Sequence, residues 1–169
     1  MVPGRATVGN SSWHRSMLAV LVLECPAWGA MMAASAVVAL TFGQERELDA
    51  RTTVIAGIYF AGGFLAYGMA RPLLALAGRR VSRPVRFVLA LVALAILTLC
   101  ATAGALAFHY RAYYAQWHED AFSVGWFYQQ VFTFLGSTYQ YLVLGTRFYW
   151  PLAPLFLLLA AWWLSRRAS

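Results

Sequence analysis

The sequence predicts an all-α, polytopic membrane protein: a four-helix transmembrane bundle with an aromatic-rich, extracytoplasmic interfacial helical segment. Of its 169 residues, 62% are hydrophobic and only 11% are charged, whereas soluble domains average about half and about a quarter. Long apolar runs recur along the chain, and 16 of its 27 aromatic residues fall within residues 108–150. This composition excludes a disordered chain and a soluble enzyme of ordinary surface polarity.

Four apolar runs cover residues 17–42, 53–76, 85–108 and 148–164. A helix needs about 20 mostly apolar residues to cross ~30 Å of hydrocarbon. A non-helical crossing would leave backbone groups without hydrogen bonds, and the alternating pattern of a β-barrel strand is missing from the sequence. We therefore expect each run to form a transmembrane helix.

Arginine placement predicts the orientation of these helices. All 13 basic residues are arginine, and the net charge is +7. Nine arginines fall on the side that holds both termini and four on the other, so we expect both termini in the cytoplasm. A rival topology, with a fifth crossing over residues 121–145, divides them eight to five. Because the arginines separate apolar runs instead of forming one polar face, no nucleic-acid partner is expected.

The segment 109–145 is expected to be interfacial or re-entrant. Tyrosine and tryptophan favour the membrane–water boundary, where the ring is apolar and one edge is hydrated. Tyr110, Tyr113, Tyr114 and Trp117 recur at helical spacing and share one face. This face fits either an extension of the third helix or a short helix lying on the membrane.

A polar stripe without charges follows in the same segment. Two interpretations remain open: the stripe satisfies its hydrogen bonds against neighbouring helices or headgroups, or it is a docking surface or one wall of a polar path. Together with two tryptophans it defines the candidate interaction surface, which consists of Gln130, Thr133, Ser137, Gln140, Trp117 and Trp126.

Small residues at four-residue spacing predict close helix packing within the bilayer. The clearest track is Gly62, Ala66 and Ala70 on the second helix, with Gly57 and Gly29 belonging to similar ones. We expect these tracks to pack helices of one chain against each other more often than to mediate self-association.

Glu24 and Arg71 are the polar candidates inside the membrane. Glu24 lies seven residues into the first run, and a lone ionised carboxylate at that depth is unfavourable. If the second helix continues past Pro72, Arg71 lies at a similar depth and can pair with Glu24. Alternatively, Pro72 ends the helix and Arg71 extends to the headgroups. Proton or cation handling at Glu24 is the functional alternative.

An outer-face site could be built from His109, His118, Glu119 and Asp120, which are metal ligands by type. Their spacing does not match a known ligand pattern, so neither a metal nor another cofactor is expected. The sequence also lacks recognisable nucleotide-binding and hydrolytic motifs. Cys25 and Cys100 are expected at different depths, as buried packing residues and not as a disulfide.

The function that these features favour is a small, non-catalytic accessory or assembly subunit of a larger membrane complex. Its partners would be membrane lipids and other membrane subunits or further copies of itself. The all-arginine, alanine-rich composition points to a GC-rich bacterial coding sequence, and hence to the bacterial inner membrane. Two alternatives are a small oligomeric transporter or channel that uses Glu24, and a lipid-handling enzyme with the outer-face site.

Overall fold

The described helices account for most of the chain in a computed structural model. The structure describes residues 20–45, 47–77 and 81–167. The expected start of the first transmembrane run, residues 17–19, lies outside them, as do five of the arginines that predicted the orientation: Arg5, Arg15, Arg46, Arg79 and Arg80.

All regular structure in the described residues is helical. A π-helical turn, η1 (Val20–Glu24), leads into α2 (Cys25–Gly43). Two long helices follow, α3 (Ala50–Ala77) and α4 (Arg83–Tyr114), and α4 runs on into the 3-10 turn η3 (Ala115–Trp117). The chain then forms α5 (Val124–Val143), the 3-10 turn η4 (Gly145–Tyr149) and α6 (Leu152–Arg167).

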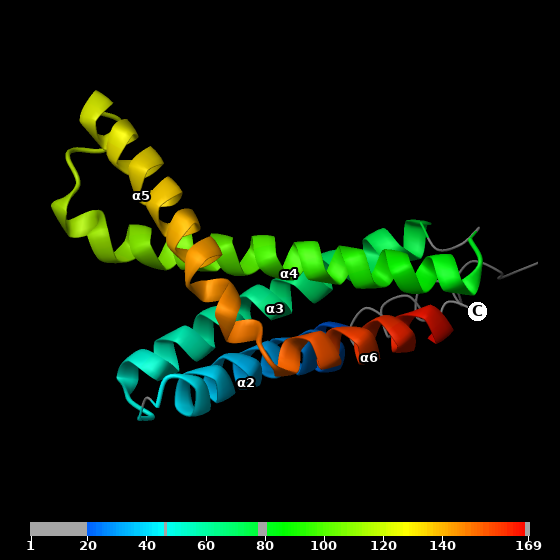
Figure 1. Cartoon of the computed structure of the whole chain (residues 1–169). Helices are drawn as coiled ribbons and strands as arrows, with labels where there is room; N and C mark the ends of the chain where they lie inside the picture. The colour runs from blue at the N-terminus through cyan, green and yellow to red at the C-terminus, as the bar shows by residue number, and fades with distance from the viewer. Residues whose placement is uncertain (1–19, 46, 78–80, 168–169) are drawn as a thin grey trace, which may run out of the picture.

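Helices α2, α3, α4 and α6 run alternately up and down along one long axis (Figure 1). α3 packs against α2 and α4, while α6 packs mainly against α4. The start of α2 and the end of α6 lie at the same end, which we call the terminal end. The α2–α3 connection, the end of α4 and the start of α5 lie at the opposite end, the α5 end.

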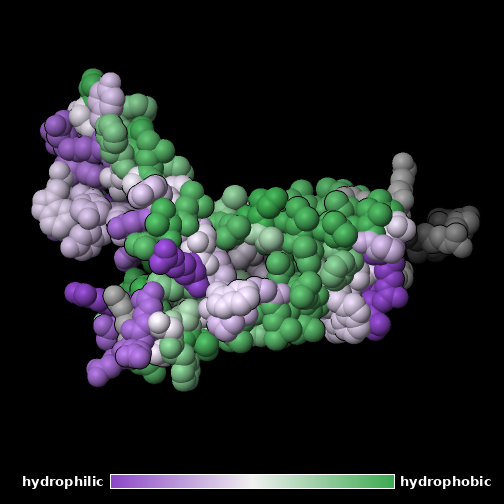
Figure 2. All heavy atoms as spheres, viewed as in Figure 1, coloured by the Kyte–Doolittle hydropathy of each residue, from purple (hydrophilic) through white to green (hydrophobic). Residues whose placement is uncertain are grey.

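Three helical stretches are long and apolar enough to cross a membrane: Val20–Gly43, Ala50–Leu76 and Arg83–Trp117. This indicates a membrane protein. The fourth apolar stretch, Leu152–Arg166, is shorter, and 16 residues of helix span only about 24 Å against the ~30 Å of a hydrocarbon core. Figure 2 shows hydrophobic residues along the sides of the helices and hydrophilic ones at both ends.

The third apolar helix is longer than the sequence predicted. α4 continues six residues beyond the expected boundary at Phe108, to Tyr114. The tyrosine face that includes Tyr110 and Tyr113 is therefore an extension of this helix, as one of the two interpretations proposed. At 32 residues, α4 is about 48 Å long and so exceeds the thickness of a hydrocarbon core.

Close contacts between helices occur where the sequence provides glycine. A Cβ added to Gly62 would lie 2.6 Å from Thr102 Cα, so α3 and α4 approach each other here as no larger residue would allow. Between α2 and α3, an added Cβ on Gly29 would lie 2.7 Å from the Phe60 carbonyl oxygen. These glycines pack helices within one chain, which is the role that the small-residue tracks predicted.

α5 departs from the common axis. It crosses α4 obliquely, and its N-terminal part projects sideways from the other helices (Figure 1). It packs on α4 and on η4, and Ser137 and Tyr141 are its buried residues. The sequence predicted an interfacial or re-entrant segment over residues 109–145. In the structure, Val124–Val143 of this segment form one 20-residue helix, which is not among the candidate membrane spans.

Candidate functional site

Glu24 and Arg71, the two predicted intramembrane polar residues, lie together near the terminal end. Arg71 Nε is 3.3 Å from Glu24 Oε2, and the two side chains are 28% and 15% exposed. The Tyr67 hydroxyl donates to the same carboxylate oxygen at 2.8 Å. The pairing is possible because Pro72 does not end α3, which continues to Ala77. The carboxylate thus ties the start of α2 to α3.

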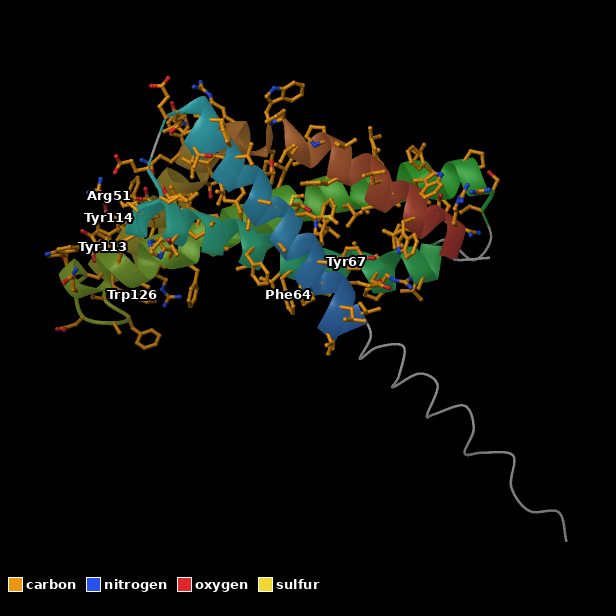
Figure 3. The ribbon with its side chains drawn as sticks, turned by 90° about the horizontal axis from the view of Figure 1, so that it is seen from below. Arg51, Phe64, Tyr67, Tyr113, Tyr114 and Trp126 are labelled. Carbon is orange, nitrogen blue, oxygen red and sulfur yellow. The ribbon has the colours of Figure 1, made fainter. Side chains whose placement is uncertain are left out.

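Sequence reasoning missed Tyr67, although a signal was present. Tyr67 lies four residues before Arg71, so the two share one face of α3. A hydroxyl at that spacing from a membrane-depth arginine could have been identified as a third member. Figure 3 shows Tyr67 on the part of α3 that lies toward the terminal end.

The structural role of Glu24, which contacts Arg71 and Tyr67, can be tested by substitution. Glu24→Gln keeps the shape of the side chain and an acceptor for Tyr67 but removes the charge opposite Arg71. Because a hydrogen bond to a charged group contributes about 1.5 to 3 kcal/mol, we expect a comparable loss of unfolding free energy. Unfolding in mixed detergent micelles measures this loss. Ion flux into liposomes should not change, and lost flux with unaltered folding would contradict the structural role.

A buried group of hydroxyls lies closer to the α5 end and was not predicted. Ser35 Oγ on α2 lies 2.9 Å from the Tyr149 carbonyl oxygen and 3.2 Å from that of Phe148, and it accepts from the Ala153 amide at 3.2 Å. The Tyr149 hydroxyl donates to Thr102 Oγ1 on α4 at 2.8 Å and lies 2.9 Å from the Tyr141 hydroxyl.

These hydroxyls form hydrogen bonds with backbone groups where the chain is not α-helical, between α5 and α6. Ser35 lies eight residues before the end of α2, about 12 Å below it. The backbone of η4 reaches this depth without being α-helical, which membrane proteins tolerate only where the backbone is buried in protein. The Tyr59 hydroxyl also donates to the Gly145 carbonyl. We assign this group a structural role in holding the connection between α5 and α6.

The polar stripe of α5 faces other parts of the same chain. Gln130 Nε2 lies 2.9 Å from His118 Nδ1, and Gln140 Oε1 accepts a short hydrogen bond from the Tyr110 hydroxyl. Ser137 is buried and donates to the Phe134 carbonyl within its own helix, and Thr133 is half-buried. This geometry favours the interpretation in which the stripe is satisfied by neighbouring helices.

The two candidate tryptophans lie in aromatic clusters near the α5 end. Trp117 is 60% exposed and packs edge-on against Tyr113, with ring centroids 5.4 Å apart. Trp126 is half-buried beside Phe122, at 5.5 Å between centroids.

The four outer-face candidates do not converge. His109 lies on α4, His118 contacts Gln130, and Glu119 accepts from the Ser123 hydroxyl at 3.3 Å. Asp120 accepts through its backbone carbonyl from the Ser123 amide. Within the described residues, no group of three or more His, Cys, Asp and Glu side chains could hold a metal ion.

Both cysteines are free thiols. Cys25 is buried at the start of α2, as expected for a packing residue. Cys100 is exposed, so the expectation of a buried position is wrong there. It lies on a face of α4 that the other described helices do not cover.

A cavity of about 850 Å³ opens at the α5 end, between the α2–α3 connection, the end of α4 and η4. Its polar lining includes Arg51, His109, Arg147 and several tyrosines, and its apolar lining includes Ile55, Ile58, Leu106 and Leu144. Figure 3 shows Arg51, Tyr113 and Tyr114 gathered at this end. In the sequence, both arginines counted only toward orientation, because nothing in their spacing indicated that they share a cavity.

A second, almost wholly apolar furrow of about 670 Å³ continues from this cavity along the joint between α3 and α4. The two share Val54, Ile58 and His109. The space above the two glycines that line the furrow is empty: a Cβ added to Gly57 or Gly104 would meet no atom within 4 Å.

The fold and these sites define a helical membrane protein with a polar, aromatic cavity at one end. No protein-family model, no curated protein and no solved structure matches the chain.

Proposed function

We propose that this chain is a small, non-catalytic accessory or assembly subunit of a larger membrane complex, embedded through four crossing helices in a bacterial inner membrane. The observation that carries the proposal is the position and exposure of α5. This helix projects sideways from the others and leaves most of its large apolar side chains exposed (Figure 1, Figure 2).

The exposed face of α5 has the composition of an interface. Phe127, Phe132 and Tyr139 are 60%, 68% and 69% exposed, while the polar stripe is turned toward the rest of the chain. Aromatic residues are enriched and charged residues depleted in the cores of protein interfaces. A helix that buries two of its own residues gains little from its own chain, so a partner covering this face would stabilise its position.

Two features support the fourth crossing and the orientation. α6 ends in Arg166, whose guanidinium lies 3.8 Å from the centre of the Trp162 ring, and arginines at helix ends extend to the interface of a short helix. The described arginines Arg83, Arg86, Arg166 and Arg167 belong to the terminal end. This agrees with a cytoplasmic location for both termini.

The alternatives receive less support. A transporter that uses Glu24 would need a path to it, but Glu24 is held by Arg71 and Tyr67 and lines neither of the two cavities described above. For a lipid-handling enzyme, His109 is the one outer-face candidate that lines either of the two cavities described above. A single histidine, without a nucleophile or a partner acid beside it, does not make a catalytic arrangement.

The proposal is tested by purifying the full-length chain from native membranes in gentle detergent and identifying what accompanies it. We expect a second polypeptide in a fixed ratio, and we expect the pair Phe132→Ala and Tyr139→Ala to reduce that ratio. The pair Leu158→Ala and Leu159→Ala, on the exposed face of α6, is the matched control and should retain the partner. An isolated chain, or equal loss from both double variants, would overturn the proposal.

A further inference from the structure

We propose that the cavity at the α5 end, together with the furrow between α3 and α4, binds one anionic phospholipid from the surrounding bilayer. Its phosphate would lie near Arg51 and Arg147, and one of its hydrocarbon chains would follow the furrow. The proposal concerns binding only and does not depend on a partner subunit.

The lining of the cavity fits a phosphate ester. Arg51 and Arg147 come from different segments, the first turn of α3 and the turn η4, and both line the same cavity. A guanidinium offers several N–H donors in a planar fork that matches phosphate oxygens, and two such groups favour an anion over a zwitterion. Tyr113 and Tyr114 add hydroxyls where the headgroup region would lie.

The charged residues that line the cavity, Arg51 and Arg147, are both positive. Its lining residues include no aspartate or glutamate. Within the described part of the chain, neither lining arginine forms an ion pair. The nearest acid in sequence, Asp49, accepts a hydrogen bond from the Thr52 amide at 2.7 Å. This bond, with a smaller contribution from the nearby charge of Arg51, holds the pKa of Asp49 below its ordinary value. Because neither guanidinium forms an ion pair within the described residues, both can bind an anionic ligand.

The furrow fits a hydrocarbon chain. On α3 it runs from Val54 to Met69, which is 15 residues or about 22 Å of helix. One leaflet of a ~30 Å hydrocarbon core is about 15 Å thick, so the furrow can accommodate a lipid chain along its length. Small residues on both helices, Gly57 and Ala61 on α3 and Gly104 and Ala105 on α4, keep it open.

The continuity of the two spaces favours a lipid over a soluble anion. Val54, Ile58 and His109 line both the basic cavity and the apolar furrow, so a ligand can occupy them together only if it is amphiphilic. Arg51 lies in the first turn of α3, at the boundary of an apolar span, which is the depth of a phosphate headgroup. A phospholipid with net negative charge meets both requirements.

Native mass spectrometry of the full-length chain in detergent tests the proposal, with dioleoyl phosphatidylglycerol and dioleoyl phosphatidylcholine as separate probes. We expect one phosphatidylglycerol per chain at concentrations where phosphatidylcholine is not retained. The double variant Arg51→Gln, Arg147→Gln should weaken phosphatidylglycerol binding about tenfold or more. Arg111→Gln, an exposed arginine of α4 at the same end that does not line the cavity, should bind as the unmodified chain does.

A second pair of variants tests the furrow independently of charge. Gly57→Leu and Gly104→Leu place side chains in the empty space of the furrow and should weaken phosphatidylglycerol binding, whereas Gly136→Leu on α5, also in open space, should not. Thermal unfolding of each variant identifies any that fail to fold. Equal retention of both lipids, equal weakening by Arg111→Gln, or displacement of the lipid by glycerol phosphate as effectively as by phosphatidylglycerol would overturn the proposal.

Discussion

Replacement of Gly62 by alanine is expected to lower the free energy of unfolding by about 1 to 3 kcal/mol, the usual range for an added methyl group in a tightly packed interior. The added Cβ would lie 2.6 Å from the Cα and 2.7 Å from the Cβ of Thr102. Because a backbone atom cannot rotate away, α3 and α4 would have to separate. The shift would also move Thr102 Oγ1, which accepts from the Tyr149 hydroxyl.

Gly57→Ala is the matched control on the same helix. A Cβ at Gly57 meets nothing within 4 Å, and alanine favours a helix over glycine by about 0.5 to 1 kcal/mol. The control should therefore unfold at the same point as the unmodified chain or slightly later. Denaturation in mixed micelles with increasing sodium dodecyl sulfate compares the two variants. Equal stability of the variants would show that α3 and α4 do not depend on close approach at Gly62.

Ser35→Ala is the second substitution with a large expected effect, a loss of about 2 to 4 kcal/mol. It removes the acceptor of the Ala153 amide and the donor to the carbonyls of Phe148 and Tyr149. Each buried group left without a partner costs about 1 to 3 kcal/mol. At this depth in the membrane no water can replace the lost hydrogen bonds. Loss of these bonds should loosen the connection between α5 and α6.

Ser165→Ala provides the comparison. Ser165 is also buried, but its hydroxyl donates to the Trp162 carbonyl in the same helix. Its removal breaks one local bond and should change stability by about 1 kcal/mol or less. Amide hydrogen exchange can locate the damage, with faster exchange expected around Ala153 in Ser35→Ala alone. Uniform exchange in both variants would contradict the role given to Ser35.

The sequence predicted the helices well because their signal is local. Long apolar runs identify α2, α3 and α4, a shorter apolar run identifies α6, and equal depth along two runs identified the pair Glu24 and Arg71. The boundaries were less accurate, since aromatic residues continue α4 beyond the apolar run without any change of periodicity. The oblique direction of α5 follows from its packing on α4, which no local pattern encodes.

The buried hydroxyls and the cavity could not be predicted for a related reason. Ser35 is an isolated polar residue in an apolar run, and Thr102 has only Thr98 one helical turn before it, so neither belongs to an extended periodic pattern. Their partners lie on Tyr149 and its neighbours, far away along the chain. Arg51 and Arg147 likewise become members of one cavity only when η4 packs against α2 and contacts Tyr59 of α3.

The buried connection at η4 has a consequence for the order in which the chain can assemble during synthesis. Its carbonyls and the first turn of α6 depend on Ser35, a residue made more than a hundred positions earlier. Until α2, α3 and α4 have packed together, this non-helical backbone has no hydrogen-bond partners at that depth of the membrane. During biogenesis, α6 would therefore reach its final position only after the earlier helices have packed together.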